Sequence, residues 1–257
     1  MIKIAVSSLA FKSKDTDSVL AAAASIGAQG VEWCDKGFLL PGDEKTAAEL
    51  MMTTLRAGLT SVSYACNFSM VQADTKLLRA ALKSAKALNS PILRIIEPEC
   101  SGTDFKARDY IKKMRLFGDE AASQGLTLCI SFVAERQLQG GGAAEIMADL
   151  GHPFVKTSWE PKLDRSFDDC MESFSLLKGK IAAMLVNHKI LDGSTEKKSE
   201  EWMHFMDAYD WQGGSPDMSR PIIICSLPEK LSAIQSAVDA LKNFGIMLRR
   251  YHGLRVY

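Results

Sequence analysis

The sequence lacks net charge, because 31 lysine and arginine residues balance 31 aspartate and glutamate residues. Without an excess of either sign, no long-range field draws the chain to nucleic acid or to an anionic membrane surface. The sequence also lacks an uninterrupted apolar run of about 18 residues, which a membrane-spanning helix needs. We therefore expect neither a nucleic-acid partner nor a membrane partner.

Paired cysteine motifs are missing too. The 6 cysteines are scattered, and several lie in apolar segments where a reduced thiol acts as a small hydrophobic side chain. The chain starts as Met1-Ile-Lys-Ile-Ala-Val6, which is typical of a strand rather than of a basic and then apolar leader. These features predict a cytoplasmic protein with free thiols.

Several catalytic signatures are missing as well. The sequence contains no P-loop, no HExxH motif and no GxSxG nucleophile elbow. The segment Ser7–Phe11, after the first apolar run, lacks the GxGxxG pattern of dinucleotide-binding folds. Cys66 and His188 could form a thiol–imidazole pair in space, but no sequence motif indicates one. Candidate catalytic residues must therefore be identified from the predicted fold.

What the sequence does contain is a regular alternation of short apolar runs and helical segments. The expected strands are Ile2–Ser7, Gly30–Trp33, Leu59–Cys66, Pro91–Ile96, Leu126–Val133, Phe154–Trp159, Ile181–Val186 and Pro221–Cys225. The expected helices are Ser18–Ile26, Asp43–Ala57, Thr75–Leu88, Thr103–Gln124, Ala143–Leu150, Phe167–Leu177, Glu200–Tyr209 and Lys230–Arg249. Helix C-terminal caps are expected at Gly27, Gly58, Gly125 and Gly179.

This alternation predicts the α/β class and a single (β/α)8 TIM barrel over residues 1–257. Strands joined by crossover helices form parallel sheet, and eight such units close into a barrel of about 250 residues. An open doubly wound sheet is the alternative, but it usually has fewer strands and often carries the glycine fingerprint that this chain lacks. No linker or low-complexity segment divides the chain, so we expect one domain.

In a TIM barrel the active site lies at the C-terminal ends of the strands. Polar residues near these ends are therefore the site candidates. We assign catalytic roles to Glu160 and His188, and substrate binding to Glu32, Arg94, Glu97, Glu135, Arg136 and Lys162.

Some of these candidates have alternative interpretations. Glu32 and Arg94 lie within apolar strands, and a buried charge needs a partner, so they are expected to pair either as a core salt bridge or as a substrate clamp. Glu97 and Glu99 are equally well explained as a solvated loop pair. Lys156, Ser158 and Glu160 share one face of their strand, either toward the barrel lumen or toward the helices.

Four segments resemble the xylose isomerase-like TIM barrels, the group of sugar-phosphate isomerases and epimerases, and the resemblance spans nearly the whole chain. They are Ser25-Ile-Gly-Ala-Gln-Gly-Val-Glu-Trp33, Ala85-Lys-Ala-Leu-Asn-Ser-Pro-Ile-Leu-Arg94, Ala121-Ala-Ser-Gln-Gly-Leu-Thr-Leu128 and Glu160-Pro161. The resemblance implies carbohydrate metabolism and a small carbohydrate or sugar phosphate as the ligand. It also implies a divalent ion held by Glu, Asp, His and Glu from the last four strands, and it is consistent with a homo-oligomer.

At three of the four ligand positions that the resemblance implies, the residue cannot serve as the family's ligand. Ser131 takes the first position and Leu185 the third, with His188 near a following aspartate position. Cys225 or Ser226 takes the fourth, so only Glu160 keeps a ligand's chemistry. Hard-cation and zinc sites normally take three or more protein ligands. We therefore expect no cofactor, and a divalent metal is disfavoured.

Three hypotheses remain in competition. The first is an isomerase or epimerase that works without the metal, with Glu160 as general base and His188 or Lys162 assisting at the carbonyl. The second is a non-catalytic barrel that binds a carbohydrate or metabolite. The third is a metal-dependent isomerase with relocated ligands, drawn from Glu32, Glu97, Glu135, Glu160 and His188.

Overall fold

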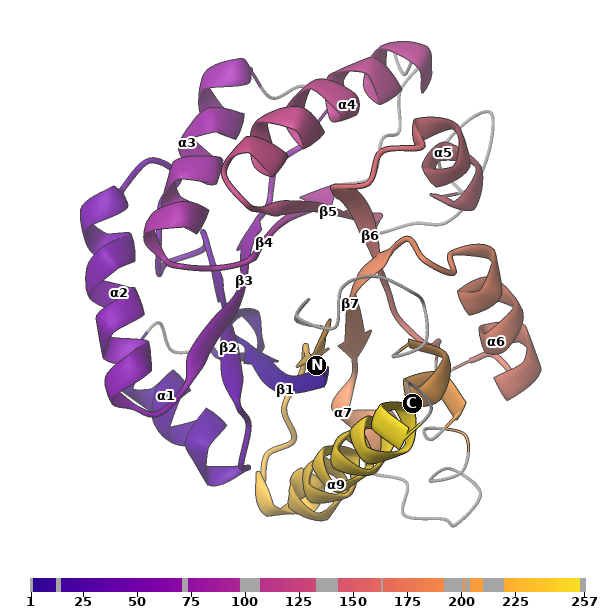
Figure 1. The fold of residues 1–257 in the computed structure, drawn as a ribbon. Helices are drawn as coiled ribbons and strands as arrows, with labels where there is room; N and C mark the ends of the chain where they lie inside the picture. The colour runs from indigo at the N-terminus through magenta and orange to yellow at the C-terminus, as the bar shows by residue number, and fades with distance from the viewer. Residues whose placement is uncertain are drawn as a thin grey trace.

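The computed structural model describes residues 2–12, 15–70, 74–97, 107–132, 143–162, 164–191, 201, 204–209 and 220–254. Eight parallel strands form a closed barrel in chain order, surrounded by a ring of helices (Figure 1). The barrel closes between β1 and β8, where the register runs from Ile2 opposite Arg220 to Val6 opposite Ile224. The predicted (β/α)8 barrel is confirmed.

All eight predicted strands are present, and each of their ends matches the prediction or differs from it by one residue. They are β1 Ile2–Ser7, β2 Gly30–Cys34, β3 Thr60–Cys66, β4 Ile92–Glu97, β5 Thr127–Phe132, β6 Val155–Trp159, β7 Ile181–Val186 and β8 Arg220–Ile224. Their apolar composition follows from burial on both faces, since the lumen lies on one side and the helices on the other. In β2 every residue is buried, including the charged Glu32.

The helices follow the predicted segments closely. They are α1 Thr16–Ser25, α2 Glu44–Arg56, α3 Thr75–Ala87, α4 Ala107–Ser123, α5 Ala143–Leu150, α6 Phe167–Leu176, α7 His188–Leu191 and α9 Ser232–Leu254. Residues 204–209, inside the helix predicted at Glu200–Tyr209, are also helical. Side chains of Asp15, Asp43, Asp74 and Ser166 accept hydrogen bonds from backbone N–H groups in the first turn of α1, α2, α3 and α6. The four glycines expected after helices all have positive φ.

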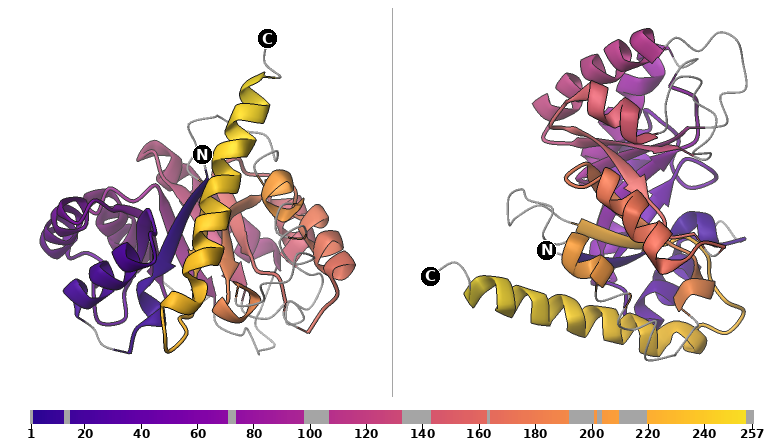
Figure 2. Two further views of the ribbon diagram at one scale, coloured as in Figure 1. Left: turned by 90° about the horizontal axis from the view of Figure 1, so that it is seen from below. Right: turned by 90° about the vertical axis from the view of Figure 1, so that its right-hand side faces the viewer.

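Two short elements were not predicted, the 3-10 helix η1 (Ser8–Ala10) and α7. Each directly follows a strand end, so each fixes the direction of the chain at the mouth of the barrel. The last helix, α9, extends five residues beyond the predicted end at Arg249. Figure 2 shows α9 running along the outside of the barrel with its C-terminal end beyond the strands. None of the described helices has the length and hydropathy needed to cross a membrane.

The barrel has two irregularities in strand register, and both lie beside polar lumen residues. The β2–β3 register shifts between Val31 and Glu32, and the β6–β7 register shifts between Thr157 and Ser158. Such bulges re-aim side chains and are common next to functional sites. Ala5, Val62, Ala183 and Ile223 form a separate buried apolar cluster in the barrel.

The start of β2 approaches β3 so closely that only glycine fits there. A Cβ on Gly30 would lie 2.6 Å from the Thr60 carbonyl oxygen and 2.6 Å from Val62 Cγ1. We predict that Gly30→Ala lowers the free energy of unfolding by about 1–3 kcal/mol, the usual cost of overpacking. Urea denaturation measures this change.

Leu176→Ala on α6 is the matched control, because Leu176 is 62% exposed. Its effect should stay within about 0.5 kcal/mol. Equal stability of Gly30→Ala and the parent protein would contradict the close packing of β2 against β3.

Candidate functional site

A buried ion pair crosses the lumen between β2 and β4. Arg94 Nε donates to Glu32 Oε2 at 2.7 Å, and Arg94 Nη2 donates to Glu32 Oε1 at 2.6 Å. The side chains are 4% and 0% exposed. The predicted pairing of Glu32 with Arg94 is confirmed, and its two-point geometry is the strongest form of such a contact.

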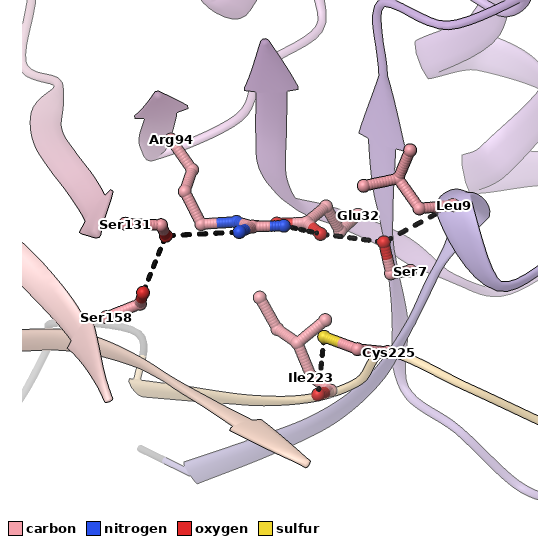
Figure 3. A network of polar contacts seen from close by, with 8 residues as sticks. All are labelled: Ser7, Leu9, Glu32, Arg94, Ser131, Ser158, Ile223 and Cys225. Carbon is pink, nitrogen blue, oxygen red and sulfur yellow. Dashed lines mark hydrogen bonds and ion pairs between the residues drawn. The ribbon is translucent and has the colours of Figure 1, made fainter. Parts of the chain in front are cut away.

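Three serines extend this ion pair on both sides (Figure 3). Ser7 Oγ donates to Glu32 Oε1 at 2.8 Å and accepts from the Leu9 N–H at 3.3 Å. On the other side, Arg94 Nη1 donates to Ser131 Oγ at 3.1 Å, and Ser131 Oγ lies 2.5 Å from Ser158 Oγ. One polar layer therefore links β1, β2, β4, β5 and β6 across the lumen.

The charge of Arg94 is retained despite its burial. Burial alone would lower the pKa of the guanidinium, but the charge and hydrogen bonds of Glu32 outweigh it and raise the pKa above its ordinary value. A buried ion pair of this kind is strongly destabilised when only one partner is removed, because the other charge stays buried. The polar layer is therefore a fixed part of the lumen.

Glu160 lies just beyond β6, at the C-terminal end of the barrel. Its Oε2 is 3.5 Å from Lys162 Nζ, and the two side chains are 35% and 39% exposed. Its charge acts on the lumen, since Glu160 contributes to the raised pKa of Cys225 at the end of β8. Glu160 and Lys162 thus sit at the mouth, as the sequence predicted, and are partly open to solvent.

His188 is the first residue of α7 and is fixed by the end of β8. Ser226 Oγ accepts from the His188 backbone N–H at 3.0 Å and lies 2.8 Å from His188 Nδ1. Because Nδ1 is engaged, Nε2 is the ring nitrogen left for other partners. The mouth therefore brings His188, Ser226 and Cys225 together on the side of β7 and β8.

The lumen thiols are poor nucleophiles. Burial is the main reason that the pKa values of Cys129 and Cys225 rise to about 12, with Arg94 opposing the rise and Glu32 adding to it. Burial also raises the pKa of Cys66. Thiolates are the reactive species, so a Cys66–His188 nucleophile is disfavoured.

Glu97, at the end of β4, is buried at 3% exposure, so its interpretation as half of a solvated loop pair is wrong. Its carboxylate accepts from Ser69 Oγ at 2.6 Å, from the Met70 N–H at 2.8 Å and from Tyr110 Oη at 3.2 Å. These bonds tie the segment after β3 and the helix α4 to the end of β4. Its predicted role in substrate binding stays a prediction, and Glu99 lies outside the described residues.

The remaining candidates divide into two groups. Glu135 and Arg136 lie outside the described residues, so their predicted roles stay predictions. On β6, Ser158 joins the lumen layer, which answers the question of which way its face points. Lys156 lies on the same strand face but toward the other end of the barrel, where its Nζ donates to the Gly179 carbonyl at 2.6 Å.

Among the residues that the structure describes, the donor set at the mouth does not fit a divalent cation. Ser131 and Leu185 occupy two of the ligand positions that the sequence resemblance implies, and the Ser131 hydroxyl already bonds a guanidinium. Within the described ranges, no three His, Cys, Asp or Glu side chains come together as metal ligands would. A cation beside Arg94 would also be repelled by its charge.

The site residues assigned from the sequence do not include Ser7, Ser158 and Ser226. All three stand at or near strand ends, which is the one signal that could have found them. Their partners Glu32, Ser131 and His188 come from other elements of the barrel, 25 to 38 residues away in sequence. Only the closed barrel brings these side chains together.

Comparisons with known proteins support the fold. No family model and no curated protein matches the chain. Solved structures do match it, including a xylose isomerase domain protein from Alicyclobacillus acidocaldarius, with a TM-score of 0.67 at 12% identity, covering 97% of this chain and 100% of that one. The architecture is thus that of the xylose isomerase-like TIM barrels.

Two further structures of this architecture carry functional names. An AP endonuclease of family 2 from Brucella melitensis matches with a TM-score of 0.65 at 15% identity, covering 91% of this chain and 97% of that one. D-allulose 3-epimerase from a Methylomonas species, in complex with D-allulose, matches with a TM-score of 0.65 at 13% identity, covering 95% and 96%. At this identity the likeness shows the fold alone.

The ion pair can be tested by a double-mutant cycle. We predict that Arg94→Met lowers the free energy of unfolding by about 3–5 kcal/mol, because Glu32 is left charged and buried. Adding Glu32→Met should restore much of this loss, because the stranded charge is removed. Urea denaturation of the parent, both single variants and the double variant gives the coupling. Additive effects of the two substitutions would contradict a tightly coupled pair.

The raised pKa of Cys129 predicts a pH-dependent stability. The folded-state pKa of about 12 exceeds the ordinary thiol value of 9.0, so the thiol contributes stability that is complete below pH 9 and is lost as the pH rises toward 12. The free energy of unfolding of the parent should therefore fall more steeply above pH 9 than that of Cys129→Ala. Parallel pH profiles for the two proteins would show that Cys129 titrates normally in the folded state.

Proposed function

We propose that this protein binds a small carbohydrate or sugar phosphate at the mouth of the barrel and isomerises or epimerises it without a divalent metal ion. The observation that carries the proposal is the place of Arg94. Its guanidinium bonds Ser131, the residue at the first ligand position of the resemblance, and Glu32 holds it there. A permanent protein cation therefore lies beside the position that a metal ion would need.

The proposed chemistry is proton transfer beside a carbonyl group. Glu160, as the carboxylate at the end of β6, takes a proton from the carbon next to the substrate carbonyl. His188 Nε2 gives a proton to the carbonyl oxygen, which forms an enediol. The proton on Glu160 then moves to the former carbonyl carbon, while His188 takes a proton from the hydroxyl of the carbon that was deprotonated, and this completes the isomerisation. Ser226 positions the imidazole through Nδ1, and the partial exposure of Glu160 leaves it open to a ligand.

Two observations support a carbohydrate as the proposed ligand. One structural neighbour is named as D-allulose 3-epimerase and was solved with D-allulose. The mouth of this chain is lined by hydroxyl groups, a carboxylate, an ammonium group and an imidazole. Such groups match the donors and acceptors of a polyhydroxylated carbonyl compound.

A non-catalytic binding barrel is the second candidate, and one contact favours it. Lys162 Nζ lies 3.5 Å from Glu160 Oε2, so an ammonium donor and a carboxylate acceptor lie side by side at the mouth. Such a pair could equally bind ligand hydroxyls without moving a proton. The two candidates share the ligand and differ only in turnover.

The relocated metal site is the least supported hypothesis. Both oxygens of Glu32 are bonded to Arg94, and one of them also accepts from Ser7. The oxygens of Glu97 accept from Ser69, Met70 and Tyr110. Two of the five carboxylate and imidazole ligands in that hypothesis are thus engaged in other contacts.

Turnover is tested by proton exchange in D2O. We predict that the protein incorporates deuterium next to the carbonyl of at least one member of a panel of ketoses and ketose phosphates, followed by NMR. Glu160→Gln and His188→Ala should each slow this exchange by about 10²–10⁴-fold, the usual contribution of a general acid or base. Glu172→Gln, an exposed carboxylate on α6, is the matched control and should leave the rate unchanged.

The outcomes of this experiment separate the two candidates. Binding of a panel member without exchange would assign the protein as a binding barrel. Exchange that survives Glu160→Gln would remove Glu160 as the base. Failure of every panel member to bind would overturn the carbohydrate assignment itself.

Independence from metal gives a separate prediction. Elemental analysis of the purified protein should find less than about 0.1 equivalent of manganese, zinc, magnesium or cobalt after dialysis. The melting temperature should be the same with and without EDTA, since no folding energy depends on a bound ion. Stoichiometric metal, with a lower melting temperature in EDTA, would contradict the metal-free mechanism.

A further inference from the structure

A chain of donors runs from the buried cation toward the mouth of the barrel. It starts at Arg94 Nη1, passes through Ser131 Oγ at 3.1 Å and reaches Ser158 Oγ 2.5 Å further on. Ser131 is 5% exposed, whereas Ser158 is partly open to solvent. Figure 3 shows the three side chains in this order, from β4 through β5 to β6.

The chemistry of Arg94 sets the direction of the first bond. A guanidinium has five N–H donors and no acceptor, and Arg94 stays charged beside Glu32. Ser131 Oγ must therefore accept from Arg94. The hydroxyl proton of Ser131 then points away from the guanidinium and needs an acceptor of its own.

Burial decides where that proton goes. Among the described residues, Ser158 Oγ is the one acceptor within hydrogen-bond distance of Ser131 Oγ. If Ser158 donated to Ser131 instead, the Ser131 proton would be buried without an acceptor, and leaving a polar group unsatisfied costs more than a hydrogen bond gains. The Ser131 hydroxyl therefore donates to Ser158.

This direction leaves the proton of Ser158 free for another partner. Its hydroxyl bonds no acceptor among the described residues, and it is not fully buried. The register shift between Thr157 and Ser158 is the local distortion of β6 at this point. The Arg94–Ser131 bond also polarises the hydroxyls beyond it, because hydrogen bonds in a chain strengthen one another.

We infer that Ser158 is a ligand-binding residue, whose hydroxyl donates a hydrogen bond to an acceptor oxygen of the molecule held at the mouth. The inference rests on the proposed function for the site and names its recognition chemistry. A carbonyl or hydroxyl oxygen of the ligand fits this donor, and the second lone pair of Ser158 Oγ stays available for a ligand hydroxyl proton. Ser158 therefore suits a ligand hydroxyl, which both accepts and donates, and Ser131 and Arg94 position the Ser158 side chain.

The direction of the chain is measured directly by neutron crystallography of the perdeuterated protein. The expected nuclear density places the deuterium of Ser131 between the two Oγ atoms and the deuterium of Ser158 toward the mouth. Deuterium on Ser158 directed at Ser131 would overturn the inference. This readout needs no ligand, so it holds whether or not a carbohydrate binds.

Affinity gives the second readout, by calorimetric titration with D-fructose and with D-fructose 6-phosphate. Ser158→Ala should weaken binding of the sugar that the parent binds by about two- to tenfold, the size of one neutral hydrogen bond. Ser61→Ala is the matched control, because its buried strand hydroxyl has no hydrogen-bond partner in the structure. It should leave the affinity unchanged.

The two readouts fail separately. If neither sugar binds the parent protein, the carbohydrate assignment fails, while the neutron density still decides the direction of the Ser158 donor. If a sugar binds equally well to the parent, Ser158→Ala and Ser61→Ala, Ser158 does not contact it and the inference is overturned.

Discussion

The two-point ion pair between Glu32 and Arg94 is the interaction on which the rest of the site depends. It joins β2 to β4 across the lumen, with Nε and Nη2 of Arg94 at 2.7 and 2.6 Å from the carboxylate oxygens of Glu32. Two charges removed from water are stable only while both are present. The pair therefore holds the polar layer in place within the buried part of the barrel.

The groups around this pair satisfy the hydrogen-bond donors and acceptors that the pair leaves unused. Glu32 has an acceptor site left after Arg94, and Ser7 fills it; Arg94 has N–H donors left after Glu32, and Ser131 accepts one. The sequence resemblance implies a metal ligand at the position of Ser131, and the serine hydroxyl there accepts a hydrogen bond from the buried guanidinium. Among the described residues, Glu160, Lys162 and His188 lie at the mouth, where the proposed function places its ligand.

The fold was predictable from sequence because its signals are local. Apolar runs and helix caps recur in order, and glycines such as Gly27 and Gly58 adopt the positive φ that ends a helix. The Glu32–Arg94 pair was predictable because a charge inside an apolar strand needs a partner. The contacts of Glu97 with Ser69 and Tyr110, and of His188 with Ser226, were not, because Glu97 and His188 lie at or beyond strand ends, where a polar side chain can be solvated and needs no protein partner. Their chemistry is ordinary, and only the closure of the barrel brings them together.

We propose that a protein cation, rather than a metal ion, occupies the polar layer of this lumen. Anomalous diffraction at the manganese absorption edge, from crystals grown with millimolar Mn²⁺, tests this proposal. We expect no anomalous peak at the C-terminal ends of β5–β8, and we expect the Arg94 guanidinium to be hydrogen-bonded to Glu32 and Ser131. A manganese ion held by Glu160 at the mouth, with Arg94 displaced from Ser131, would contradict it.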